Sequence, residues 1–319
     1  MSAHSHDHAH PAGDHAGHAH GSQSHVHAPA SFGSAFAIGI SLNTVFVIVE
    51  AVYGYAANSM ALVADAGHNL SDVLGLVVAW IAIVLSKRAP SPRFTYGLRG
   101  TSILAALFNA VFLLVAVGAI GWEAILRLFD PQPVASMTVL IVAAVGIAIN
   151  GFTAWLFAAG RKGDLNIRGA YLHMAADAGV SLGVVMAALV IMWTGWVWVD
   201  PIISLVIGGI IVAGTWGLLR DSAAMSLSAV PRWVDPLAVR RYLEERVGVV
   251  QVHDLHIWSM STTELALTCH MVMPSGSPGD AYLMDIAHHL KEDFGIQHTT
   301  VQIETDPTSA CALAPDHVV

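Results

Sequence analysis

Six long apolar runs dominate the first two thirds of the chain. They span residues 32–57, 60–85, 101–129, 137–160, 169–194 and 200–219. Each run is long enough to cross the hydrocarbon core of a bilayer, which is about 30 Å thick and takes about 20 helical residues. The pattern therefore predicts an all-α, six-helix transmembrane domain over residues 32–220.

A different pattern begins after Ser228. Asp235-Pro236 is typical of a helix start, and Gly295 is typical of a helix end. The periodicity predicts helices over 236–247 and 280–294, and strands over 249–259, 264–273 and 299–304. The order α-β-β-α-β predicts a small two-layer α+β domain over 221–306.

The two ends of the chain are predicted as loose tails. Residues 1–31 consist mainly of His, Ala, Gly, Ser, Pro and Asp, and they contain nine of the 18 histidines. Such a composition cannot bury a core, so it predicts disorder. The imidazoles would bind zinc, copper or nickel loosely; the alternative is a solvated tail without a role. Residues 307–319 are predicted as the second loose tail.

Positive charge is distributed unevenly among the loops. Lysine and arginine occur between the second and third runs, between the fourth and fifth, and after the sixth, whereas the other three loops contain none. Because basic loops stay on the cytoplasmic side of a membrane, both termini are predicted to be cytoplasmic.

The composition supports a membrane protein and limits its partners. Hydrophobic residues make up 55% of the chain and charged residues 12%, and the mean hydropathy is +0.61, which is too apolar for a soluble domain of this length. After Pro231, five basic residues face twelve acidic ones. This segment suits cations, and we expect no nucleic acid. Cys269 and Cys311 do not make a disulfide framework.

Two copies of one spacing lie inside the apolar runs: His68 with Asp72, and His173 with Asp177. Residues four apart share a helix face. The predicted topology makes the two helices antiparallel, so the two His/Asp pairs can interleave around one ion near mid-membrane. Two imidazoles and two carboxylates form a plausible tetrahedral set for Zn²⁺, and Cd²⁺ or Co²⁺ would fit the same set.

Ionisable residues at membrane depth point to function by default. The alternative is a polar network that only holds helices together. An intramembrane hydrolase is a weaker alternative, because the chain has no HExxH motif and no glutamate beside the His/Asp pairs. We therefore expect a binding site rather than an enzyme.

Other polar residues in the runs have two interpretations each. Asp65 is either an accessory ligand or a tie between helices, and Asn43 and Glu50 either contribute to the ion path or serve packing. Asp200, just before Pro201, is predicted as an N-cap. Glu123 and Arg127 are predicted to form a local pair.

The His/Asp set also suggests a mechanism. Its histidines titrate near neutral pH, and a metal requires them deprotonated, so protons compete with the ion. The leading hypothesis is a secondary transporter that moves Zn²⁺ out and H⁺ in. The alternative is a membrane-anchored metal sensor.

The chain resembles the cation diffusion facilitator family, in its zinc-transporting branch, over about residues 32–305. The motifs that carry the resemblance are Ala64 to Asp72 (ADAGHNLSD), Tyr96-Gly97 with Arg99, His173-x-x-x-Asp177, Asp200-Pro201, and Val252 to Trp258 (VHDLHIW). The resemblance implies a homodimeric Zn²⁺/H⁺ antiporter in the lipid bilayer of the bacterial inner membrane. It assigns transport to His68, Asp72, His173 and Asp177, and histidine at both His positions favours zinc.

The same resemblance implies that the cytoplasmic domain is ferredoxin-like or metallochaperone-like in outline, carries a regulatory zinc site and helps the protein to form a dimer. It implies no organic cofactor. The positions that match family ligands are His253, His270, His298 and Glu304, with Asp306 and His288 matching sites used in other members. The alternative for His256, His288 and His289 is a surface or strand-packing role. Cys269 faces away from His270 if the strand is regular.

Overall fold

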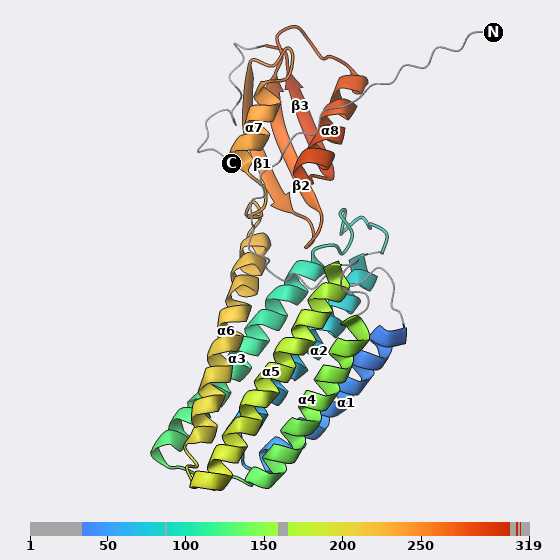
Figure 1. Cartoon of the computed structure of the whole chain (residues 1–319). Helices are drawn as coiled ribbons and strands as arrows, with labels where there is room; N and C mark the ends of the chain where they lie inside the picture. The colour runs from blue at the N-terminus through green and yellow to red at the C-terminus, as the bar shows by residue number, and fades with distance from the viewer. Residues whose placement is uncertain (1–33, 87, 159–164, 307–310, 312, 314–319) are drawn as a thin grey trace, which may run out of the picture.

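The computed structural model describes residues 34–86, 88–158, 165–306, 311 and 313. The histidine-rich segment 1–31 and most of 307–319 lie outside the described residues. A bundle of long helices forms one end of the molecule, and a small α/β domain stands at the other (Figure 1). The predicted fold class is confirmed.

The bundle contains the six helices that the apolar runs predict. Their bounds are α1 Ser34–Ala56, α2 Met60–Ser86, α3 Thr101–Phe129, α4 Ser136–Ala158, α5 Leu165–Thr194 and α6 Val199–Ser226. By length and composition, the described parts of α3, α4, α5 and α6 can each cross a membrane, and Ser41–Ala56 of α1 is a shorter apolar helix.

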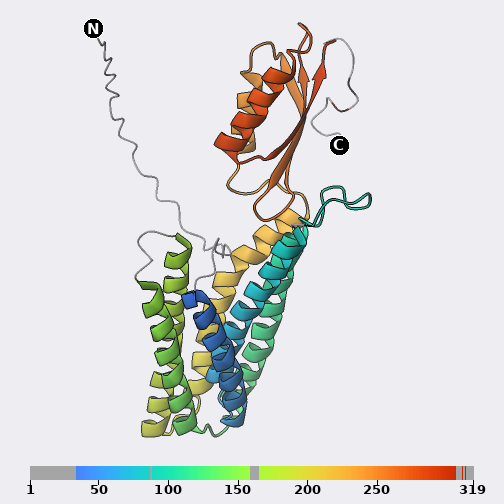
Figure 2. The ribbon, with the colours of Figure 1, turned by 90° about the vertical axis from the view of Figure 1, so that its right-hand side faces the viewer.

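The apolar core of the bundle lies in the half that is distant from the α/β domain. It includes Leu62, Leu113, Val142, Val184 and Ile207, from five different helices. Toward the α/β domain, α4 and α5 diverge from α2 and α3 (Figure 2). The helices are therefore packed most tightly at the end away from the α/β domain.

Asp200 ties the distant ends of α2 and α6 together. Its carboxylate accepts hydrogen bonds from the hydroxyl of Ser59 and from the backbone N–H of Met60 at 2.6 Å. It therefore caps α2, whose first N–H groups have no partner within the helix. The prediction that Asp200 caps its own helix is wrong, because it lies within the first turn of α6 and Trp198 occupies the N-cap position.

A second tie lies near the same end of the bundle. Arg127 donates to Glu123 at 3.0 Å, which confirms the predicted local pair. Arg127 also donates to the backbone oxygen of Asn58 at 2.8 Å. This arginine thus joins α3 to the turn between α1 and α2.

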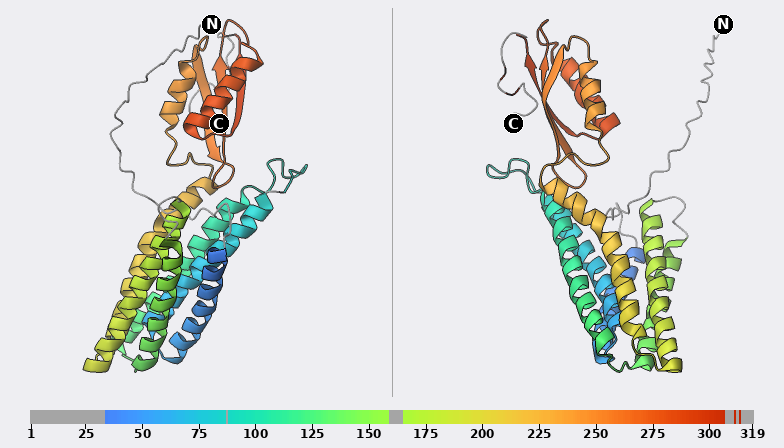
Figure 3. Two further views of the ribbon diagram at one scale, coloured as in Figure 1. Left: turned by 45° about the vertical axis from the view of Figure 1, so that its right-hand side comes forward. Right: turned by 90° about the vertical axis from the view of Figure 1, so that its left-hand side faces the viewer.

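The α/β domain has a three-stranded sheet in the order β1-β2-β3. The strands are β1 Gln251–Ser259, β2 Leu265–Val272 and β3 His298–Glu304; β1 and β2 are antiparallel, and β2 and β3 are parallel. Helices α7 Pro236–Glu244 and α8 Asp280–Phe294 cover one face of the sheet (Figure 3). As predicted, Asp235 caps α7, and Gly295 ends α8 with φ 68°.

The α/β domain contacts the bundle through the β1–β2 hairpin. Arg99 forms an ion pair with Glu264 at 2.7 Å, and Ser102, at the start of α3, accepts from the backbone N–H of Thr262 at 3.1 Å. The rings of Tyr96 and His298 meet edge to face at 5.5 Å between centroids. We call these contacts the hairpin joint.

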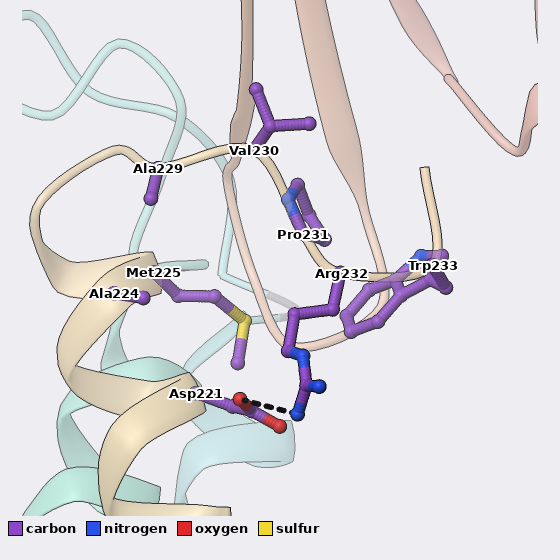
Figure 4. Close-up of a pocket in the computed structure, with 8 residues that line it drawn as sticks. All are labelled: Asp221, Ala224, Met225, Ala229, Val230, Pro231, Arg232 and Trp233. Carbon is purple, nitrogen blue, oxygen red and sulfur yellow. Dashed lines mark ion pairs between the residues drawn. The ribbon is translucent and has the colours of Figure 1, made fainter. Parts of the chain in front are cut away.

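The covalent connection runs from α6 into a short linker. Residues 229–233 fold back over the end of α6 and line a small pocket with it (Figure 4). The guanidinium of Arg232 lies 3.9 Å from the carboxylate of Asp221 on α6. The linker is thereby held against the helix that it leaves.

Candidate metal centres

The two His/Asp pairs of α2 and α5 meet inside the bundle. The Nε2 atom of His68 lies 3.7 Å from Asp72 and 3.4 Å from Asp177. The Nε2 atom of His173 lies 3.2 Å from Asp72 and 3.6 Å from Asp177. Each imidazole therefore lies between both carboxylates, and the pairs interleave in the antiparallel manner that the topology predicts.

His68, Asp72 and Asp177 each offer one ligand atom, and these atoms all lie within 4.8 Å of one another. Two ligand atoms that each lie about 2.1 Å from a tetrahedral ion are about 3.4 Å apart. All four nitrogen–oxygen distances fall between 3.2 and 3.7 Å. Within the described residues, both buried oxygens of Asp177 and one of Asp72 lack a hydrogen-bond partner. Buried carboxylates are costly unless they are paired or bind a cation, so His68, Asp72 and Asp177 are arranged to hold one. His173 contacts both carboxylates beside them.

The four side chains are more exposed on the side of the site that faces the α/β domain. The side chains of His173 and Asp72, on the side of the α/β domain, are 42% and 32% exposed. Those of His68 and Asp177, on the opposite side, are 21% and 2% exposed. The group is therefore open toward the α/β domain and closed by the apolar core toward the other end of the bundle.

A second set of buried polar residues lies next to the site, on the side away from the α/β domain. Asp65 is fully buried and accepts a hydrogen bond from the Ser181 hydroxyl at 2.9 Å, which joins α2 to α5. Glu50, also fully buried, accepts from the Asn69 amide at 3.2 Å. This bond fits the predicted alternative in which Asp65 is a tie between helices. Ser181 was not singled out from the sequence; its i+4 position after Asp177 was the available signal.

Asn43 approaches the other side of the group. Its amide donates to the sulfur of Met174 at 3.3 Å, beside His173 in the sequence. It therefore contacts the helix that carries two of the four ligand candidates. It does so through a methionine rather than through His173 or Asp177.

A second cluster of possible ligands lies on the sheet of the α/β domain. His253, His270, Glu304 and Cys311 each offer one atom, and these atoms all lie within 4.8 Å of one another. His253 and His270 are cross-strand partners on β1 and β2, and Glu304 ends β3. Three of the four predicted cytoplasmic residues therefore meet, and Cys311 joins them.

The electrostatics of this cluster favour an ionised Glu304. Burial raises the pKa of this carboxyl, but hydrogen bonds from His270 and Cys311 and the positive charge available on the two histidines outweigh burial, so the pKa is lowered overall. The Oε1 atom lies 2.8 Å from Nδ1 of His270. The carboxylate is thus held in the form that binds a metal.

The remaining predicted residues lie elsewhere. His298 begins β3, at the opposite end of the strand from Glu304, and contacts Tyr96 in the hairpin joint. His288 is exposed on α8, where its ring meets His289 at 5.9 Å. Asp306 is exposed just beyond β3. The structure does not bring any of these three into the four-residue cluster.

Comparisons with known proteins agree across both domains. The family model of the cation efflux transmembrane domain matches residues 36–225, and that of the cation efflux protein cytoplasmic domain matches residues 233–306. The chain is therefore a multi-pass membrane protein that also carries the C-terminal α/β domain of these efflux proteins.

Three curated relatives align over most of both chains. A cadmium, cobalt and zinc/H⁺-K⁺ antiporter of Bacillus subtilis is 36% identical over 84% of this chain and 88% of its own. The metal cation efflux system protein CzcD of Cupriavidus metallidurans is 36% identical over 89% and 90%. The zinc transporter ZitB of Escherichia coli is 35% identical over 85% and 87%. With both domains matched and the motifs placed as the resemblance implies, the chain belongs to the cation diffusion facilitator family of cation efflux proteins.

Proposed function

We propose that this protein exports Zn²⁺ from the cytoplasm in exchange for protons. The intramembrane site for the transported ion consists of His68, Asp72, His173 and Asp177. The observation that carries the proposal is that His68, Asp72 and Asp177 each offer one ligand atom within 4.8 Å of one another. Beside them, Nε2 of His173 lies 3.2 Å from Asp72 and 3.6 Å from Asp177.

The chemistry of the ligands favours Zn²⁺, with Cd²⁺ and Co²⁺ as further substrates. Imidazole and carboxylate suit these ions, whereas Mg²⁺ and Ca²⁺ prefer all-oxygen shells with more ligands. The relatives are named for zinc, cadmium and cobalt. Since the imidazoles must lose their protons before they bind metal, a proton gradient can drive release.

Access to the site supports loading from the cytoplasm. The more exposed pair, Asp72 and His173, faces the cytoplasmic domain, while Asp177 is almost fully buried. We infer an inward-open arrangement in which the buried tie between Asp65 and Ser181 closes the outer side. Export then requires that this tie opens and that the cytoplasmic side closes.

The cytoplasmic domain holds a regulatory metal site in this proposal. His253, His270 and Glu304 supply its ligands, and metal relieves the repulsion between two acidic domains in a homodimer. The protein lies in the bacterial inner membrane with both termini in the cytoplasm, because the basic loops lie on the side of the cytoplasmic domain.

Reconstitution in proteoliposomes tests the transport proposal. Purified protein with an imposed pH gradient is expected to move Zn²⁺ and protons in opposite directions. Asp177→Asn keeps the shape of the side chain but removes its charge, so we expect transport to fall at least tenfold, on the order of a lost metal contact. The matched control is Glu123→Gln, because Glu123 pairs only locally at the other end of the bundle.

The same assay decides between a transporter and a membrane-anchored sensor. A sensor would bind zinc and signal without any metal-driven proton flux. Zinc transport at the wild-type rate by Asp177→Asn would refute the site, and absence of flux from the wild-type chain would refute the transport function. An ion site built from two helices inside the bundle argues against a mere anchor.

A further inference from the structure

Cys311 lies in the cytoplasmic cluster although no motif of the chain accounts for it. It comes from the C-terminal segment, more than 40 positions after His270 in the chain. Its Sγ atom lies 3.7 Å from Nδ1 of His270. A sulfur and a nitrogen that bind one tetrahedral Zn²⁺ at about 2.3 and 2.1 Å are about 3.6 Å apart. The thiol is therefore placed at the distance of a shared ion.

The other members of the cluster complete the same geometry. Nε2 of His253 lies 3.5 Å from Oε2 of Glu304, again an edge of the expected length. The Nδ1 atom of His270 is closer to Glu304, at 2.8 Å, so this edge must lengthen when an ion enters. Each of the four residues offers one donor atom, these atoms are of three chemical kinds, and they all lie within 4.8 Å of one another.

Within the described part of the chain, His253 lacks the hydrogen bonds that a buried imidazole normally makes. The side chain is only 3% exposed, yet neither ring nitrogen has a hydrogen-bond partner among the described residues. A buried imidazole without hydrogen bonds is unfavourable unless another group completes its bonding. A metal ion bound at Nε2 would do so.

Asp254 contacts His270 on the side of the ring that faces away from the cluster. A bulge in β1 between His253 and His256 places Asp254 in the left-handed region with φ 50°. Its carboxylate lies 3.6 Å from Nε2 of His270, the nitrogen that faces away from the cluster. A carboxylate behind a metal-binding histidine orients the ring and makes it a better ligand.

We propose that the Cys311 thiolate is the fourth ligand of the cytoplasmic metal site, with His253, His270 and Glu304. The site then has two nitrogens, one oxygen and one sulfur, and it takes Zn²⁺ or the softer Cd²⁺. The proposal rests on the regulatory metal site proposed above and adds the sulfur ligand to it. Binding converts the thiol to a thiolate and releases its proton to solvent.

The sulfur has two consequences for the protein. It raises the preference of the regulatory site for Cd²⁺ over ions that favour oxygen, because thiolate is a soft ligand. It also fastens the C-terminal segment to the face of the sheet opposite α7 and α8. Metal binding then joins all three strands and the end of the chain.

Cys269 provides an internal control. It lies next to His270 on β2 but points into the apolar core on the other face of the sheet. Burial raises the pKa of its thiol to about 12, and the Asp254 charge adds to this. Cys269 should therefore neither bind metal nor react with alkylating reagents at neutral pH.

Cobalt spectroscopy of the full-length protein tests the proposal. Co²⁺ bound through a thiolate gives a near-ultraviolet charge-transfer absorption that His and carboxylate ligands do not give. The intramembrane ligands and the histidine-rich segment contain no cysteine. We expect the band in the wild-type chain and in Cys269→Ser, and its loss in Cys311→Ser. A band that persists in Cys311→Ser would overturn the proposal.

The His253→Ala variant separates this proposal from the one on which it rests. If His253→Ala removes one bound Co²⁺ but the wild-type chain shows no thiolate band, the regulatory site stands and Cys311 is not its ligand. If neither His253→Ala nor Cys311→Ser changes the number of bound ions, both proposals fail. Equilibrium titration should show Cd²⁺ binding weakened at least about tenfold in Cys311→Ser.

Alkylation of the wild-type protein gives a test without substitutions. Mass spectrometry after iodoacetamide treatment should show Cys311 modified rapidly without metal and at least about tenfold more slowly with Cd²⁺. Cys269 should remain unmodified in both samples, which reports an intact domain. Equal modification of Cys311 with and without Cd²⁺ would contradict the proposal.

Discussion

Replacing Ser181 with alanine removes the hydroxyl that joins α5 to Asp65 on α2. The change leaves the apolar core intact, because only one oxygen atom is lost and alanine favours a helix more than serine does. Ser181 and Asp65 are both fully buried. The other carboxylate oxygen of Asp65 has no hydrogen-bond partner among the described residues. The substitution therefore weakens the closed outer side of the transport site and little else.

The size of the effect follows from the burial of the bond. A hydrogen bond to a charged group contributes about 1.5–3 kcal/mol and one between neutral groups about 0.5–1.5 kcal/mol. In the outward-open state that we propose, water would reach Asp65 and replace the serine, so the loss would fall on the closed state alone. A shift of about 1–2 kcal/mol changes the ratio of the two states roughly 5- to 30-fold.

Amide hydrogen exchange measures this shift. We expect exchange to be roughly 5- to 30-fold faster in residues 60–66 of α2 and 178–184 of α5, and unchanged in the α/β domain. Thr153→Ala is the matched control, because the buried Thr153 hydroxyl bonds only within α4, to Ile149 at 2.9 Å. Equal exchange in the two variants, or faster exchange throughout the bundle, would refute the view that the Asp65–Ser181 bond closes the outer side.

Four further predictions concern the cap on α2, the hairpin joint, the carboxyl of Glu304 and the histidine-rich segment. Asp200→Asn weakens the cap on α2, so the free energy of unfolding should fall by about 0.5–2 kcal/mol in a denaturant titration, against no change for an exposed control. A double-mutant cycle on Arg99 and Glu264 should give a coupling of only about 0.2–1 kcal/mol, smaller still at high salt, because both side chains are more than one third exposed. The lowered pKa of Glu304 means that its carboxylate stabilises the metal-free cytoplasmic domain fully at pH values above the unfolded pKa of about 4.3. This stabilisation is lost as the pH falls through the lower folded pKa. An acid titration of unfolding should therefore show this loss in the wild-type chain and not in Glu304→Gln. Deletion of residues 1–30 should raise the zinc concentration for half-maximal transport and leave the maximal rate nearly unchanged, and an unchanged half-saturation would remove any feeding role for that segment.

The six helices of the bundle and their directions were predictable, because each is a long apolar run and consecutive runs must cross the membrane in opposite directions. The α8 bounds and the cap at Asp235 came from local signals alone, and local signals suffice where the residues that interact are close in the chain. The interleaving of His68 and Asp72 with His173 and Asp177 was also predictable. It requires only the spacing within each helix and the antiparallel direction of the two helices.

The errors and omissions all involve partners that are distant in the sequence. Asp200 looked like a cap for its own helix, but tertiary packing brings the start of α2 against it. His298 lies on the same strand as Glu304, yet strand length separates them by about 20 Å. Cys311 could not be placed, because no periodicity specifies where a segment beyond the last strand folds back. The Asp254 bulge was hidden because it breaks the alternation on which strand prediction depends.

The hairpin joint connects the cytoplasmic domain to helix α3 of the bundle. The joint contacts the start of α3, and the linker connects the same domain to α6. Helices α3 and α6 also pack against each other. Helix α3 has 29 residues and is therefore about 44 Å long. A rotation of about 5° at the joint would move its far end by about 4 Å. That displacement is comparable to the distances of 3.2 to 3.7 Å between the histidine nitrogens and carboxylate oxygens of the candidate transport site.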